Sequence, residues 1–121
     1  MELEFVRQGL KEYAYENYKT SIDQFSKALE KNPNCIEAFI YRASSYEKLG
    51  NYNSAIEDLD KAQLEENYSK YEYDILYARA KILIGLNIFK PALDELKKAK
   101  EIENLTKEKI SNLDKLINIV S

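Results

Sequence analysis

The sequence predicts an all-α protein in which antiparallel helix pairs stack into an array. Three observations favour this fold class. First, a stretch beginning at Asn17 reads NYKTSIDQFSKALEKNP, and similar stretches begin at Asn51 and Ile88. Second, apolar residues within each stretch recur at i, i+4, i+7 and i+10, which places them on one face of an α-helix. Third, another helical segment precedes each stretch, so the repeated unit is a pair of helices.

One register relates all three helix pairs. The first helix of each pair has a large apolar residue followed four positions later by a small one, which are Phe5 and Gly9, Phe39 and Ala43, and Leu76 and Ala80. The small residue lets the partner helix approach closely. The second helix shares four positions: Tyr18, Tyr52 and Phe89; Ile22, Ile56 and Leu93; Phe25, Leu59 and Leu96; and Ala28, Ala62 and Ala99.

The spacing between the pairs is not constant. The shared alanines are separated by 62 − 28 = 34 and 99 − 62 = 37 residues, so three extra residues precede the third pair. They fall around the segment ENYSKYEYD and lengthen either the loop or the following helix.

Glycine, asparagine and proline mark the helix ends. Gly50 lies between the helices of the second pair, where a residue after a helix can take φ > 0. The first pair has Glu16 and Asn17 at this turn, and we expect Asn17 to be the left-handed residue. Pro33 ends the first pair. Pro91 lies in the first turn of its helix, where a missing N–H is tolerated.

The C-terminal segment has the pattern of a capping helix. A fourth unit would need Gly or Ala at position 114, but the chain has Asp114 there, so the array stops. We therefore expect seven helices in one domain of residues 1–121, with units at about 2–35, 36–69 and 73–104 and a cap at about 105–120. The apolar stripe of the cap consists of Leu105, Ile110, Leu113, Leu116, Ile117 and Val120.

A period near 34 with two helices per unit resembles the tetratricopeptide repeat family across nearly the whole chain. The resemblance implies a right-handed superhelical array, an α-solenoid, in which the first helices of the pairs line a concave groove. It also implies a protein-binding scaffold. The first unit departs from the pattern at Gln8 and Glu12, where apolar residues are usual. The second unit matches best, at Phe39, Arg42, Ala43, Tyr46, Gly50, Tyr52, Ala55, Leu59 and Ala62.

Composition argues against several other functions. The net charge of −3 comes without a basic stripe, so we expect no nucleic-acid partner. Cys35 is the only cysteine and the chain has no histidine, so we expect no enzyme, no catalytic residue, no metal site and no cofactor. No apolar run reaches the roughly 20 residues of a membrane span. The N-terminus lacks the pattern of a secretory signal, and we expect a cytoplasmic protein.

Carrying the family's groove over by register predicts a partner-binding surface. Leu3, Val6, Leu10 and Tyr13 form a stripe on the first helix that is distinct from the packing face of Phe5 and Gly9. A helix with two apolar faces needs a packing neighbour for each of them. The remaining groove positions are Glu37, Ile40, Tyr41, Ser44 and Glu47 in the second unit and Asp74, Tyr77, Ala78 and Lys81 in the third.

Co-chaperones of this family hold the acidic tails of heat-shock chaperones in a clamp of Lys and Asn, then Asn, then Lys and Arg. Such donors replace the water that the ligand's carboxylates lose. The matching positions here are Val6, Leu10, Tyr41, Asp74 and Ala78, and none conforms. We therefore expect no such clamp.

The groove is instead apolar and aromatic with acidic residues around it. It predicts a partner segment with apolar or aromatic anchors and flanking Lys or Arg, bound as a strand or a short helix. The expected anchors are Tyr13, Tyr41 and Tyr77. Two alternatives stay open. In the first alternative, the chain is a self-assembly domain that forms a homodimer. In the second, it is a co-chaperone with a non-standard clamp.

Overall fold

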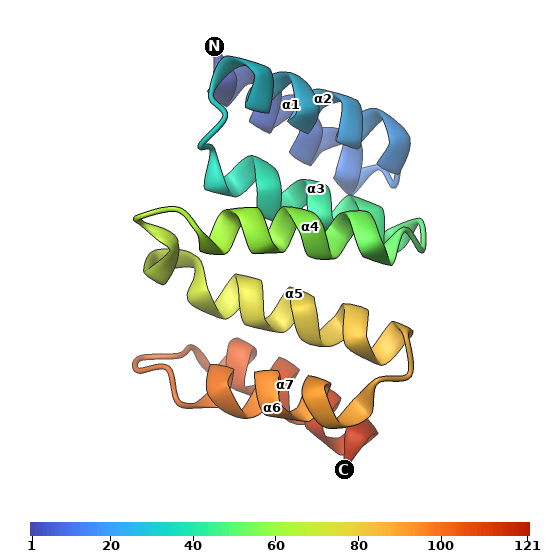
Figure 1. Cartoon of the computed structure of the whole chain (residues 1–121), viewed down its shortest axis with the longest axis vertical. Helices are drawn as coiled ribbons and strands as arrows, with labels where there is room; N and C mark the ends of the chain where they lie inside the picture. The colour runs from blue at the N-terminus through green and yellow to red at the C-terminus, as the bar shows by residue number, and fades with distance from the viewer. The chain divides into compact units, whose positions relative to one another are not determined.

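The computed structural model describes residues 1–121 throughout and contains seven α-helices, one short 3₁₀ helix and no strands (Figure 1). The all-α class and the seven predicted helices are confirmed. The chain divides into two compact units, Met1–Tyr68 and Ser69–Ser121, which are described separately below.

The first unit contains two antiparallel helix pairs, drawn from blue to green in Figure 1. Helix α2 packs on both α1 and α3, and α3 packs on α4. In the first pair, a small residue of α1 faces a large one of α2. Gly9 faces Phe25, whose ring is completely buried. The helices of this unit are α1 (Glu2–Ala14), α2 (Tyr18–Lys31), α3 (Ile36–Lys48) and α4 (Tyr52–Gln63).

Two buried polar contacts fix the packing of the first unit. The hydroxyls of Ser21 on α2 and Ser45 on α3 lie 2.8 Å apart, and both side chains are fully buried. Arg42 on α3 donates two hydrogen bonds of 2.7 Å to the carboxylate of Asp58 on α4. Arg42 also donates to Ser26 at 3.0 Å, so one guanidinium links α2, α3 and α4. A bidentate, largely buried pair of this kind is specific in its geometry.

The second unit, drawn from yellow to red in Figure 1, contains α5 (Glu72–Gly85), α6 (Phe89–Lys100) and α7 (Lys107–Val120). Helix α7 caps the unit because Leu113, which is fully buried, packs in one cluster with residues of α5 and α6. Thr106 begins this helix by accepting a hydrogen bond from the backbone N–H of Lys109. Asp114, at the register position where a fourth helix pair would need a small residue, forms an ion pair with Lys100 at 2.7 Å.

The extra residues before the third pair lie at a short 3₁₀ helix, η1 (Tyr68–Tyr71), directly before α5. The insertion therefore forms an element of its own rather than an extension of α5 alone.

The prediction that Asn17 is the left-handed residue of the first turn is wrong. Glu16 has φ 63°, whereas Asn17 has φ −88°. Glu16, Gly50 and Asn87 occupy the same register position, and all three have positive φ. In each turn the following N–H donates to the carbonyl five residues earlier, as Asn17 does to Glu12 at 2.8 Å. This is the Schellman arrangement, in which the position after the helix is left-handed whatever residue it has.

Candidate protein-interaction surface

The predicted binding residues of the first unit differ in depth. Leu3 and Leu10 on α1 are 62% and 38% exposed, and Tyr13 is half-buried. Val6 and Ile40, in contrast, are each only 5% exposed. Val6 packs with Phe25, Ala28, Cys35 and Ala38 in the core of the unit. These two side chains support the surface from beneath, and the outer row on α1 consists of Leu3, Leu10 and Tyr13.

The neighbouring row on α3 is polar and acidic. Glu37, Ser44 and Glu47 are half-buried on this helix. The hydroxyl of Ser44 donates back to the Ile40 carbonyl at 3.2 Å, which turns it along its own helix. Register pairs each apolar residue of α1 with a polar one on α3, because Leu3 corresponds to Glu37, Leu10 to Ser44 and Tyr13 to Glu47. The two rows together, Leu3, Leu10, Tyr13, Glu37, Ser44 and Glu47, are called the α1–α3 surface below.

Tyr13 is held in place at one end of this surface. Its ring meets that of Tyr18 edge to face, with centroids 5.4 Å apart and an angle of 70°. Burial raises the pKa of the Tyr13 phenol, and the nearby Tyr18 and the negative charge of Glu47 raise it further. A tyrosine phenol is protonated at neutral pH, and the raised pKa keeps that of Tyr13 a hydrogen-bond donor to a higher pH than usual.

Tyr41, an expected anchor, has a second role in the core. Its side chain packs against the buried cluster of the first unit, and its ring centroid lies 6.0 Å from that of Phe25. Substitution of Tyr41 would disturb this packing as well as the surface, so its loss is not a clean test of binding.

The face of α1 that would stack on a preceding helix pair is charged. In α3 the residues that face α2 include Ala38, Tyr41 and Ser45. Their register equivalents in α1 are the exposed residues Glu4, Arg7 and Lys11. Glu4 and Arg7 form an exposed ion pair at 2.8 Å. This face of α1 is therefore unsuited to an apolar helix–helix contact.

In the second unit the predicted residues of α5 belong to an aromatic and cationic cluster. Tyr77 stacks on Tyr73 with ring centroids 5.6 Å apart and an angle of 10°. The ammonium of Lys81 lies 5.2 Å from the Tyr77 ring, and that of Lys109 on α7 lies 4.8 Å from the Tyr73 ring. Each contact is within the range of cation–π attraction. Ala78, by contrast, is only 7% exposed.

The sequence reasoning missed Tyr73 and Lys109. Tyr73 lies four residues before Tyr77, so the helical period predicts that their rings meet. Lys109 comes from the capping helix, and no register relates that helix to α5. Its contact with Tyr73 required the structure.

The carboxyl of Asp74 lies beside this cluster and keeps contact with solvent. Neighbouring atoms still remove enough water to raise its pKa, and this effect exceeds the opposite influence of Lys109.

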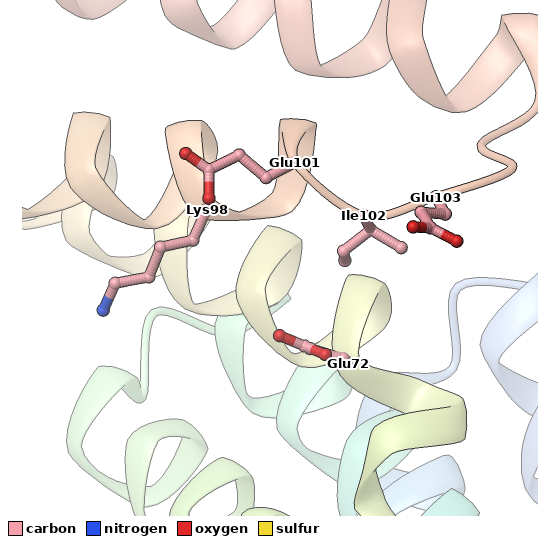
Figure 2. A pocket seen from close by; sticks show the side chains of 5 residues that line it. All are labelled: Glu72, Lys98, Glu101, Ile102 and Glu103. Atoms are coloured by element: carbon pink, nitrogen blue, oxygen red, sulfur yellow. The ribbon is translucent and has the colours of Figure 1, made fainter.

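A small pocket in the second unit has mixed charge. Its volume is about 390 Å³, and Figure 2 shows the five side chains that line it: Glu72, Lys98, Glu101, Ile102 and Glu103. Pockets for organic ligands are mostly apolar. Here Ile102 is the only apolar side chain in the lining, so the pocket does not resemble such a site.

The structure holds no metal-binding cluster, and its single thiol is buried. No three His, Cys, Asp or Glu side chains are placed to hold a metal ion. Burial raises the pKa of the Cys35 thiol, which keeps it protonated and poorly nucleophilic. No helix is long and apolar enough to span a membrane.

No protein-family model matches the sequence, and no curated protein matches it. Solved structures do resemble the fold closely. The first TPR domain of human RPAP3 has a TM-score of 0.82 at 21% identity, covering 98% of this chain and 91% of that one. The first TPR of Spaghetti (RPAP3), bound to the HSP90 peptide SRMEEVD, has a TM-score of 0.79 at 20% identity, covering 98% and 94%. A TPR-like protein from Chlorobium tepidum has a TM-score of 0.76 at 17% identity, covering 98% and 91%.

Proposed function

Because the chain has the tetratricopeptide-repeat fold, we propose that it is a non-enzymatic protein-interaction scaffold that binds a peptide or helix of a partner. The observation that carries this proposal is the apolar row on α1, in which Leu3 and Leu10 are exposed and Tyr13 is half-buried. Core packing does not account for this row, because α1 already buries Val6 and Gly9 against the rest of the unit. An extra apolar stripe on a helix favours a partner.

The proposed ligand differs from the peptides in the HSP90 and HSP70 complexes of the RPAP3 TPR domains. Acidic chaperone tails need several cationic or amide donors around their carboxylates. The matching positions here offer apolar side chains, a tyrosine that packs on the core, and the carboxyl of Asp74. These residues favour a ligand with apolar or aromatic anchors.

Each exposed leucine of the α1 row can supply a modest part of the binding energy. Full burial of a leucine side chain contributes about 1.5–3 kcal/mol, so covering the exposed part of Leu3 or Leu10 contributes roughly 1 kcal/mol. Loss of one of them should therefore weaken binding by about fivefold, because 1.4 kcal/mol corresponds to a factor of ten.

Self-assembly through end-to-end stacking is disfavoured by the charged face of α1. Light scattering at two concentrations separates the two functions. A monomer at low micromolar concentration agrees with the scaffold, whereas a stable dimer that Leu10→Asp dissociates would assign the row to a second copy.

The direct test is a fluorescence titration of the whole chain with labelled peptides that have leucine or aromatic anchors. Leu10→Asp should weaken binding of the best peptide by at least about tenfold. Leu64→Asp is the matched control, because Leu64 lies in the same unit, is 84% exposed, and is outside the proposed surface. Equal affinities for the two variants, with helicity intact, would refute the assignment. The peptide SRMEEVD should bind more weakly than about 10 μM, near −7 kcal/mol.

A further inference from the structure

The α1–α3 surface consists of an apolar row and a polar row that run side by side. One row, on α1, is apolar at Leu3 and Leu10, and the parallel row on α3 begins with a carboxylate at Glu37. Leu3 and Leu10 are seven residues apart, which is two helical turns or about 10 Å along the axis. A ligand that covers both rows must be apolar on one side and polar on the other.

The negative charge of the first unit favours a positively charged polar side on the ligand. The first unit, Met1–Tyr68, contains 8 Lys and Arg against 13 Asp and Glu, so its net charge is 8 − 13 = −5. The basic residues of α3 are Arg42 and Lys48 alone. Arg42 is bound to Asp58 and is therefore not available to balance the acidic row.

Glu37 is the carboxylate best placed to meet a ligand. It is half-buried at the first turn of α3, and it forms no ion pair with a lysine or arginine of the unit. Its register equivalent on α1 is Leu3, the most exposed residue of the apolar row. A cation beside Glu37 would thus lie next to an apolar contact, where partial loss of water strengthens the attraction.

We infer that the occupant of the α1–α3 surface is a basic amphipathic helix of a partner protein, with apolar side chains on Leu3 and Leu10 and a Lys or Arg beside Glu37. This inference rests on the proposed function and specifies its ligand. The partner helix presents apolar residues at i and i+7, which match the spacing of Leu3 and Leu10. Its basic residues lie on the adjacent face of the same helix. Helix-in-groove recognition uses anchors of this spacing.

The test uses three designed peptides that share leucines at i and i+7 and differ only in their polar residues, which are Lys, Gln or Glu. The whole chain should bind the Lys peptide at least about tenfold more tightly than the Glu peptide at low salt, and the difference should shrink as salt screens the charges. Glu37→Lys should remove this preference. The matched control is Glu57→Lys, because Glu57 is an exposed acid on α4 of the same unit and makes the same change in net charge.

The outcomes separate this inference from the proposed function. If all three peptides bind equally and Leu10→Asp weakens them all, the scaffold function stands and the basic ligand is refuted. If none binds, the proposed surface itself fails. If Glu37→Lys and Glu57→Lys reduce the preference equally, the general field of the unit causes it, and the assignment to Glu37 is overturned.

Discussion

Gly9 and Phe25 form a complementary pair that a single methyl group should disrupt. A Cβ placed on Gly9 would overlap Cε1 of Phe25 and lie only 2.7 Å from Cδ1 and Cζ of the same ring. Carbon atoms in contact normally lie about 3.5–4.0 Å apart. The ring would therefore have to move by about 1 Å, but it is fully buried, so its movement would displace packed neighbours.

The expected effect of Gly9→Ala is the balance of two terms. Overpacking a core costs about 1–3 kcal/mol. Alanine in a helix interior is better than glycine by about 1 kcal/mol. We therefore expect a net loss of up to about 2 kcal/mol in the unfolding free energy, or a fall in Tm of roughly 4–8 °C per kcal/mol for a unit of this size.

The other helix pairs supply the compensating change. Where the small residue is Ala43 or Ala80, the facing register position has Leu59 or Leu96 instead of a phenylalanine. Phe25→Leu should therefore relieve Gly9→Ala. The unfolding free energy of the double variant should be about 1–2 kcal/mol higher than the value obtained by adding the effects of the two single changes, as expected for residues in contact.

Urea unfolding followed by circular dichroism measures all four proteins of this cycle. If Gly9→Ala is more stable than the wild type by the full helix-propensity gain of about 1 kcal/mol, and the two changes add without coupling, the close-packing argument is wrong.

Three further predictions concern charge and backbone strain. Asp58→Ala should destabilise the first unit by about 3–5 kcal/mol, because it leaves the guanidinium of Arg42 largely buried and unpaired. Asp114→Ala breaks a half-exposed pair and should cost less than about 1 kcal/mol in the same urea experiment; equal costs would contradict this. Glu16→Gly should raise stability by up to about 1 kcal/mol in thermal unfolding, because the left-handed strain that it relieves exceeds the chain entropy that glycine loses; a lower Tm would show that the strain is smaller than this entropic cost. Asp74→Asn should stabilise the chain at pH 7, since the raised folded-state pKa means that the carboxyl's contribution is lost as pH rises through that pKa. The advantage should fade as pH falls to the ordinary value of 3.8, and an advantage that grows toward low pH in urea titrations would refute it.

Helical period and register were sufficient to predict the helix pairs. Phe25, Leu59 and Leu96 recur because each must fill the space left by a small residue on the facing helix. That the array ends at Asp114 stays a prediction, made because this side chain is too large and too polar for a helix crossing.

The burial of single side chains and the backbone conformation of single residues could not be predicted from the sequence. Register places Val6 and Leu10 on similar faces of α1, but the position of Phe25 and Ala38 decides that Val6 is buried. At the first turn, asparagine is the better left-handed residue by preference. The Schellman hydrogen bonds nevertheless place Glu16 there, because helix length and not residue type determines which position follows the helix.

The most direct test of the central claim is to follow the backbone amide signals of the whole chain by NMR while the Lys peptide is added. The largest shifts should fall on α1 and α3 around Leu3, Leu10 and Glu37, and Leu10→Asp should need at least about tenfold more peptide to produce them. Shifts that instead concentrate on α2, α4 or α6, or that Leu10→Asp leaves unchanged at every peptide concentration, would contradict the proposed surface.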